Sequence, residues 1–381
     1  MTATPAESFA ARSAASYAGA AGVLGLFRIL FAASTLLFDL DLLPRGVWTG
    51  GVPSTFINAP PGLPSLLVDT FGGSLPMPVV YGLNVIALVS LWLLLAGLRT
   101  RTSSYGFAGS LLVLCANDYA YIKIDHNLFS ILVPMILAGR WGEHWSLDAM
   151  RRSNAGALHR SPISTGLPLL WLAILLGSAM FVAARAKASS GWLDPDTTAA
   201  WNHVVFNFYA NERDTPLTRF AMTHPPPRVM REAMDWATVL LEAVFILAVP
   251  WARAVRFLCA IALLFHAGIF VTMNIYFQAS LLTYLAFVDW RPVRDALRHR
   301  RASHSLRAMA RRVRLWHVAV AAAAWTFLTL WNGRAPHVSL LRLAGVDARL
   351  LLEATGQAIA TAAALFALAR LAIAVARRRR R

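Results

Sequence analysis

The sequence predicts an all-α fold, a polytopic helical membrane bundle of about ten spans with the N- and C-termini in the cytoplasm. Two observations lead to this fold class. First, the composition is 57% hydrophobic and only 14% charged, whereas soluble domains carry about 25% charged residues. A chain of 381 residues with so few charges cannot cover itself with a wetted surface, so lipid must be one of its solvents. Second, long apolar runs recur along the chain, and arginines gather in the short segments between them.

The apolar runs give the positions of the predicted spans. A helix needs about 20 mostly apolar residues to cross a bilayer. The longer runs are 22–40, 77–97, 166–185, 233–250, 256–273, 315–331 and 354–375. Shorter runs cover 104–120, 127–140 and 278–289. The last is too short to cross alone, so a half-span buried among neighbouring helices is one interpretation.

The arginines set the predicted orientation, because cytoplasmic loops carry an excess of basic residues. With the N-terminus inside and about ten spans in alternation, the strongly basic segments fall on the inner side. They are Arg99–Arg101, Arg140–Arg160, Arg253–Arg256, the loop 291–314 and the tail Arg377–Arg381. We expect the loop and the tail to contact anionic lipid of the inner leaflet. The expected location is a cell membrane, the bacterial inner membrane.

The predicted organisation has four parts. They are an N-terminal cytoplasmic segment 1–21, a transmembrane domain 22–290, a basic cytoplasmic loop 291–314, and two closing spans with a basic tail in 315–381. The net charge of +17 does not indicate a nucleic-acid partner, because the charge follows the loops and no helix-turn-helix or RNP-like signature occurs. Histidine spacing gives no metal motif, so we expect no metal.

Two long segments, 44–75 and 186–231, are predicted on the outer side. The second contains an apolar stripe at helical spacing, formed by Trp201, Val204, Val205 and Phe208. This stripe predicts an amphipathic helix. We interpret it as a helix lying on the outer leaflet. The alternative is a lid packed on the bundle.

Lysine is rare in this chain. Lys123 and Lys187 are two of 36 basic residues, so 36 − 2 leaves 34 arginines. Arginine stays charged in proteins, whereas a desolvated lysine can become a neutral base. Lys123, at the junction of the third and fourth spans, is therefore a candidate base. The alternative is that both lysines sit at span ends and reach the headgroups.

Other polar residues lie within or beside the predicted spans. Glu242 lies mid-span, where a charge costs about 2.5 kcal/mol or more, so we expect it to face the bundle interior and have a partner. The candidate catalytic residues are Lys123, Asp125, His126, Glu242 and His266. Polar residues at the outer span ends are candidates for ligand binding, namely Arg185, Lys187, Asn274 and Gln278. Structural interpretations remain open, with Asp125 as a helix N-cap and His266 as a packing residue.

Several short blocks occur in a familiar order over roughly 22–290. They are Leu26–Phe31, Lys123–Asn127, Glu143–Asp148, Gly191–Asp194, Leu241 with Glu242, and Phe265 with His266 followed by Asn274. In these blocks the chain resembles the horizontally transferred transmembrane (HTTM) family, which is related to the membrane domain of vitamin K-dependent gamma-carboxylase.

The resemblance implies a chemistry. In the carboxylase a lysine deprotonates vitamin K hydroquinone, and Lys123 resembles that lysine. The implied cofactor is reduced vitamin K or menaquinol. Two features differ from the carboxylase: fewer residues separate Lys123 from His126, and a basic loop with two spans follows 290 in place of a large lumenal domain. Another branch of the family, which also lacks that domain, includes a bacterial protein needed to mature a secreted peptide toxin.

Three hypotheses remain open at this point. The chain is a quinol- and oxygen-using enzyme of the carboxylase or epoxidase type, with Lys123 as base. Alternatively, it is a membrane maturation or export factor for a secreted peptide, bound by the outer segments 44–75 and 186–231. In the third, it is a non-catalytic membrane protein whose buried polar groups serve only helix packing.

Replacing Lys123 by arginine tests the first hypothesis directly. Lys123→Arg keeps the positive charge but removes the possibility of a neutral amine, so we expect quinol turnover to be abolished while the protein stays folded. Turnover is measured by mass spectrometry of the quinol products, and folding by circular dichroism. Normal turnover in this variant would rule out Lys123 as the base.

Overall fold

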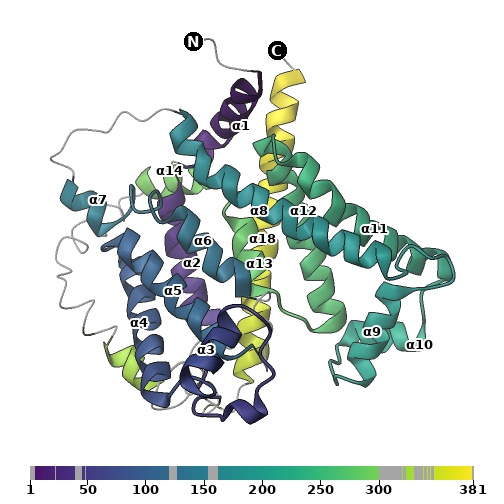
Figure 1. The fold of residues 1–381 in the computed structure, drawn as a ribbon. Coiled ribbons are helices and arrows are strands. Elements are labelled where there is room, and N and C mark those ends of the chain that lie inside the picture. The colour runs from purple at the N-terminus through teal and green to yellow at the C-terminus, as the bar shows by residue number, and fades with distance from the viewer. Residues whose placement is uncertain are drawn as a thin grey trace. The chain divides into compact units, whose positions relative to one another are not determined.

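The computed structural model describes residues 5–21, 23–38, 45–47, 49–119, 127–152, 162–299, 320, 323–329, 338, 341, 344 and 347–379. Within these ranges the regular secondary structure is helical, apart from one isolated β-bridge between Pro53 and Gly73. Figure 1 shows the helices in chain order. The all-helical part of the predicted fold class is confirmed.

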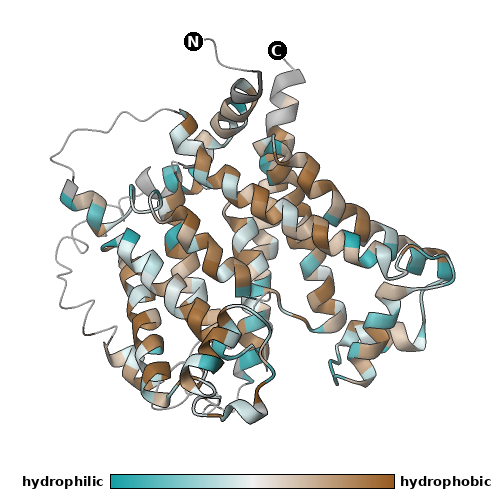
Figure 2. Ribbon diagram, in the orientation of Figure 1, coloured by the Kyte–Doolittle hydropathy of each residue, from teal (hydrophilic) through white to brown (hydrophobic). Residues whose placement is uncertain are grey.

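Four described helical segments are long and apolar enough to cross a membrane. They are Met77–Ala96, Pro162–Ser189, Ala252–Met273 and Arg349–Ile373. A fifth crossing is counted if Ser8–Gly19 and Leu24–Phe38 form one bent span. Figure 2 shows hydrophobic residues along these helices. The protein thus has the helices of a membrane protein.

The chain divides into two compact units. Unit 1 comprises Met1–Gly19, Arg160–Val288 and Gln357–Arg381, and unit 2 comprises Ala20–His159 and Asp289–Gly356. The helix α18 (Ala348–Arg379) contributes to both.

Unit 2 is built on a hairpin of two long helices, α4 (Met77–Ala96) and α5 (Thr100–Asn117), that pack along each other. Its other described elements are α2 (Leu24–Phe38), a 3₁₀ turn (Ser54–Phe56), α3 (Leu63–Phe71), α6 (Leu128–Leu137), α7 (Leu147–Arg152) and α14 (Arg291–His299). The α4 helix ends at Ala96 and is followed by Gly97, whose φ of 70° is the left-handed conformation that glycine adopts at helix ends.

Backbone groups at the end of unit 2 that holds the α4–α5 turn are satisfied by side chains. The buried Arg28 donates to the carbonyls of Trp141 (2.9 Å) and Trp145 (2.6 Å). Asp148 accepts from the amides of Arg99 (2.9 Å) and Thr100 (2.8 Å), the first residues of α5. These bonds tie α2, the α4–α5 turn and the α6–α7 connection together, because helix ends leave amides and carbonyls unpaired.

Unit 1 is built on α8 (Pro162–Ser189) and α11 (Arg228–Ala248), which pack along each other. Around them lie most of α1 (Pro5–Ala21), then α9 (Ala199–Tyr209), α10 (Pro216–Thr223), α12 (Ala252–Met273) and α13 (Gln278–Leu285). Gly177 allows α8 to approach α11 closely, since a Cβ there would lie 3.2 Å from the Cα of Ile246. On α1, the Tyr17 hydroxyl donates to the carbonyl of Val249 (2.6 Å).

The predicted spans coincide with helices wherever the chain is described, and 315–331 lies mostly outside the described residues. Four crossings by length and composition are fewer than the predicted number of about ten. The difference arises because α6 and α13 are short, α5 is rich in polar residues and α11 carries charges. The eight residues of α13 extend about 12 Å, too short to cross a bilayer alone.

The predicted amphipathic helix is present as α9. Trp201 and Val204 of its apolar stripe are buried, and Val205 and Phe208 are half-buried, as α9 packs against α11 and α12. The stripe therefore faces the protein, as in the lid alternative. The apolar residues on the exposed side of α9, such as Phe206, lie outside that stripe.

The α4–α5 turn provides a stability test. Gly97→Ala would force an L-residue into the left-handed region and put its Cβ 2.4 Å from the Cβ of Ser146, so we expect a loss of roughly 2 kcal/mol or more. Gly109→Ala is the control, because nothing lies within 4 Å of that Cβ, and it should gain about 0.5–1 kcal/mol as a mid-helix glycine. Thermal unfolding in detergent measures both. Equal effects of the two substitutions would contradict the steric argument.

Candidate functional site

An ion pair between α8 and α11 lies at the centre of the candidate site in unit 1. The Lys187 ammonium lies 2.7 Å from both carboxylate oxygens of Glu242. The side chains are 24% and 12% exposed, respectively. Glu242 therefore has the partner that a mid-span carboxylate requires, and that partner is one of the two lysines of the chain.

The face of α11 that carries Glu242 also carries a second acid. Asp235 lies seven residues earlier, two helical turns away on the same side. It is buried and accepts hydrogen bonds from the amides of Ala199 (3.0 Å) and Ala200 (2.6 Å), the first residues of α9. One face of α11 thus binds α8 through Glu242 and caps α9 through Asp235.

Trp192 completes the surroundings of the lysine. The ammonium of Lys187 lies 5.4 Å from the centroid of the Trp192 ring, within the range of a cation–π interaction. The chain reaches this position through a turn after α8, in which the Trp192 amide donates to the Lys187 carbonyl (3.2 Å) and Gly191 has a φ of 84°. The ammonium is therefore held between a carboxylate and an indole ring.

His266 lies on α12 among aromatic side chains. Its ring centroid lies 4.9 Å from that of Phe277 and 5.5 Å from that of Tyr284. Its Nδ1 lies 2.8 Å from the carbonyl of Ala262. A carbonyl only accepts, so we assign the proton to Nδ1, which leaves a lone pair on Nε2 in the neutral ring. Nε2 has no hydrogen bond to the part of the chain that is described.

These groups form one cluster. The ring of Tyr284, which lies beside that of His266, also lies 6.3 Å from that of Phe245 on α11, three residues after Glu242. We call Lys187, Glu242, His266 and Tyr284 the polar cluster. It joins α8, α11, α12 and α13 in a part of unit 1 that is otherwise mostly apolar.

The other predicted residues of unit 1 are placed as follows. Gln278 is buried at the start of α13, and Asn274 ends α12 with a φ of 51°. Arg185 is exposed, because it precedes Lys187 by two residues and so lies on another side of α8. It does not join the polar cluster.

Three of the predicted catalytic residues, Lys123, Asp125 and His126, lie outside the described residues. The described chain before them ends in a polar network within unit 2. The Oδ2 of Asp118 lies 3.3 Å from the Nε of the buried Arg45, and its Oδ1 accepts from the hydroxyl of Thr49.

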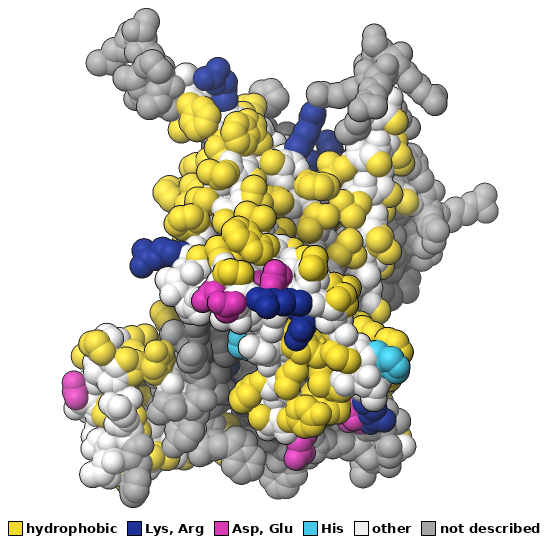
Figure 3. Space-filling view, turned by 90° about the vertical axis from the view of Figure 1, so that its right-hand side faces the viewer, with side chains coloured by type: hydrophobic (Ala, Val, Ile, Leu, Met, Phe, Trp, Pro, Cys, Tyr) yellow, Lys and Arg dark blue, Asp and Glu magenta, His cyan; other side chains and the backbone are white. Residues whose placement is uncertain are grey.

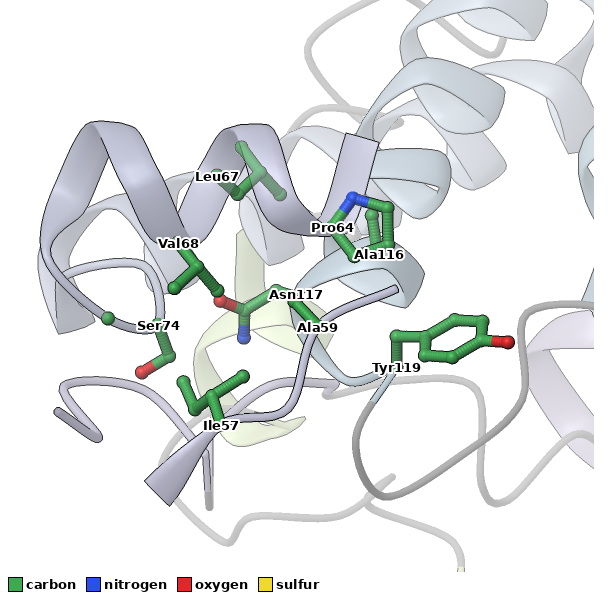
Figure 4. Close-up of a pocket in the computed structure, with 10 residues that line it drawn as sticks. Ile57, Ala59, Pro64, Leu67, Val68, Ser74, Ala116, Asn117 and Tyr119 are labelled. Atoms are coloured by element: carbon green, nitrogen blue, oxygen red, sulfur yellow. The ribbon is translucent and has the colours of Figure 1, made fainter. Parts of the chain in front are cut away.

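A small cavity lies beside this network in unit 2 (Figure 4). Ser74, Asn117 and Tyr119 contribute to its lining. Its volume of about 10 Å³ holds about one water molecule. It is therefore too small for a quinol.

Sequence reasoning missed the aromatic part of the polar cluster and its surroundings. Trp192, Phe277 and Tyr284 were not singled out as functional residues. A signal was present for two of them, since Phe277 and Tyr284 are seven residues apart and so lie on one side of a helical segment. Asp235 and Glu242 are also seven residues apart, so the sequence placed the two acids on one side of their helix.

Comparison with known proteins adds no relative. No family model matches the chain, and no curated protein and no solved structure matches it. The resemblance to the HTTM family thus stays a prediction from the sequence blocks. No group of three or more metal-binding side chains occurs among the residues that the structure describes.

The ion pair is tested by a double-mutant cycle. Lys187→Met or Glu242→Gln alone leaves one partner half-buried and without its counter-charge. The two single substitutions should therefore lower the free energy of unfolding by more, in sum, than the double substitution does. We expect a coupling free energy of about 1–3 kcal/mol between the two positions. Denaturation of the four proteins in detergent measures it. Strictly additive effects would show that the two side chains do not depend on each other.

Proposed function

We propose that the protein is a polytopic membrane enzyme of the carboxylase or epoxidase type that binds a lipophilic quinol, with Lys123 as its base. The observation that carries the proposal is the polar cluster of unit 1. It combines a paired lysine and glutamate with a neutral histidine among apolar helices. Ionisable residues within membrane spans are functional-site hypotheses by default, because burying them is costly.

The polar cluster has the chemistry that a quinol requires. The Nε2 lone pair of His266 is an acceptor for a quinol hydroxyl. The ring of Phe277, which lies beside His266 and is 37% exposed, offers a face on which a quinone ring can stack. In this proposal, reduced vitamin K or menaquinol supplies the oxygen-dependent chemistry, while the residues of the chain bind it, orient it and accept its proton. Asp125 and His126 accompany Lys123, and Asn274 and Gln278 contribute to binding, whereas Arg185 lies outside the polar cluster.

The proposal also includes a topology of about ten spans, with both termini in the cytoplasm of a bacterial cell. The exposed surface of α11 supports one span beyond the four that length and composition give. Trp236, Leu240, Val244 and Leu247 are 39–68% exposed and recur at helical spacing, while the charges of α11 lie at its start or on the buried side. A helix with an exposed apolar stripe and an inward-facing acid fits a lipid-facing span. Figure 3 shows hydrophobic side chains over this part of unit 1, bordered by a belt of charged ones.

A second candidate function, maturation or export of a secreted peptide, is favoured by a different surface. Exposed apolar residues gather on α9 and α10, namely Phe206, Tyr209, Leu217 and Phe220, with 43–68% of their surface exposed. Large exposed apolar patches mark interaction sites. This function predicts a gene for a small secreted peptide beside the gene of this protein, and its absence from several close relatives would count against it.

The enzymatic proposal is tested by quinol epoxidation. The protein is purified in nanodiscs and supplied with oxygen and reduced vitamin K or menaquinol, and the epoxide is detected by mass spectrometry. We expect epoxide from the parent protein and a loss of roughly tenfold or more in His266→Ala, because the quinol hydroxyl would lose its hydrogen-bond acceptor.

The matched control for this experiment is His224→Ala. His224 lies in the same unit but is exposed, and it stacks on Phe220 away from the polar cluster. It should keep full activity. If the parent makes no epoxide and purifies without bound quinone, the enzymatic proposal fails and peptide maturation or a non-catalytic role takes its place.

A further inference from the structure

A second cavity lies in unit 2, at the end where α4 meets α5. Its volume is about 670 Å³, within the range of roughly 300–1,000 Å³ that is usual for ligand pockets. Three arginines line it, Arg99, Arg101 and Arg151. The cavity is separate from the polar cluster, which belongs to unit 1.

The acids of the cavity already have partners. Glu143 is bound by Arg140 at 3.1 Å. Asp148 accepts from the amides of Arg99 and Thr100 and from the Thr100 hydroxyl (2.9 Å). By contrast, the side chains of Arg99, Arg101 and Arg151 form no ion pair within the described ranges, and all three residues are exposed. The cavity thus offers three guanidinium groups to a ligand.

The start of α5 adds two further donors. The first amides of a helix have no acceptor in the helix itself. Asp148 takes those of Arg99 and Thr100, which leaves the amides of Arg101 and Thr102 at the cavity wall. Guanidinium groups and helix N-terminal amides together are the groups that bind phosphate.

The surroundings point to a lipid as the source of the phosphate. The α4 helix, long and apolar enough to cross a membrane, ends at Ala96 next to the cavity. Tyr105 follows Arg101 by one helical turn on the same side of α5 and is 46% exposed, and Trp145 is 37% exposed. Exposed Tyr and Trp next to basic residues at the ends of apolar helices are typical of the headgroup level.

We propose that this cavity binds the phosphate of an anionic phospholipid headgroup. The site does not depend on the quinol proposal, and it is distinct from the basic loop 291–314 and the C-terminal tail. Its specificity comes from the three arginines, which form no ion pair with the described residues, because a zwitterionic headgroup brings its own positive charge into the same space.

Native mass spectrometry of the full chain in equal mixtures of phosphatidylglycerol and phosphatidylcholine tests the proposal. The parent protein should retain phosphatidylglycerol selectively. Each arginine near a lipid surface contributes roughly a five-fold gain in affinity, so Arg101→Gln should weaken retention roughly five-fold and Arg101→Gln with Arg151→Gln roughly thirty-fold. Circular dichroism checks that both variants fold.

Arg253→Gln is the matched control. Like Arg101 in α5, Arg253 is exposed and is the second residue of a long helix, α12, but it does not line the cavity. It should leave the retention unchanged. Equal retention of the two lipids, or an equal loss in Arg253→Gln, would overturn the site. Displacement of the lipid by millimolar glycerol 3-phosphate or inorganic phosphate would overturn the lipid assignment in favour of a soluble phosphate ligand.

Discussion

The ion pair between Lys187 and Glu242 is the interaction on which the arrangement of unit 1 depends. A carboxylate in the middle of an apolar helix must be paired, neutralised or turned outward. Pairing with α8 fixes which side of α11 faces inward, and that side then carries Asp235 to the start of α9. The opposite side exposes the apolar stripe that begins at Trp236. The need to pair Glu242 thus fixes the rotation of α11, so that one side faces α8 and α9 and the other exposes its apolar residues.

In unit 2, buried arginines satisfy buried acceptor groups. Arg28 lies fully buried and donates to two backbone carbonyls, for which the fixed fork of a guanidinium is well suited. Arg45 is buried beside Asp118 in the same unit. These arginines hold the connections between helices. At Lys187 the chain instead uses an ammonium, a compact charge that fits between a carboxylate and the face of an indole ring.

The sequence predicted the helices well, because apolar runs and their polar boundaries are local features. It also predicted that Glu242 would have a partner, since the cost of a mid-span carboxylate does not depend on the fold. It did not predict which partner, because Lys187 is 55 residues away and only packing brings α8 onto α11. Arg185 shows the limit of reasoning from proximity in sequence. It lies two residues from Lys187, yet the helical twist places it on another side.

The two candidate sites suit different ligands because their charges are balanced differently. In the polar cluster, the charges of Lys187 and Glu242 cancel, and His266 offers one neutral acceptor among aromatic rings. A neutral, partly buried site favours an uncharged lipophilic ligand with a hydroxyl group, since an anion or a cation would lose hydration there without a free counter-charge. The cavity of unit 2 is the opposite case, because it is open and its arginines have no acid partner in the part of the chain that the structure describes. A phosphate keeps part of its hydration there and gains the free guanidinium groups. The two proposals thus assign neutral chemistry to one unit of the chain and anionic headgroups to the other.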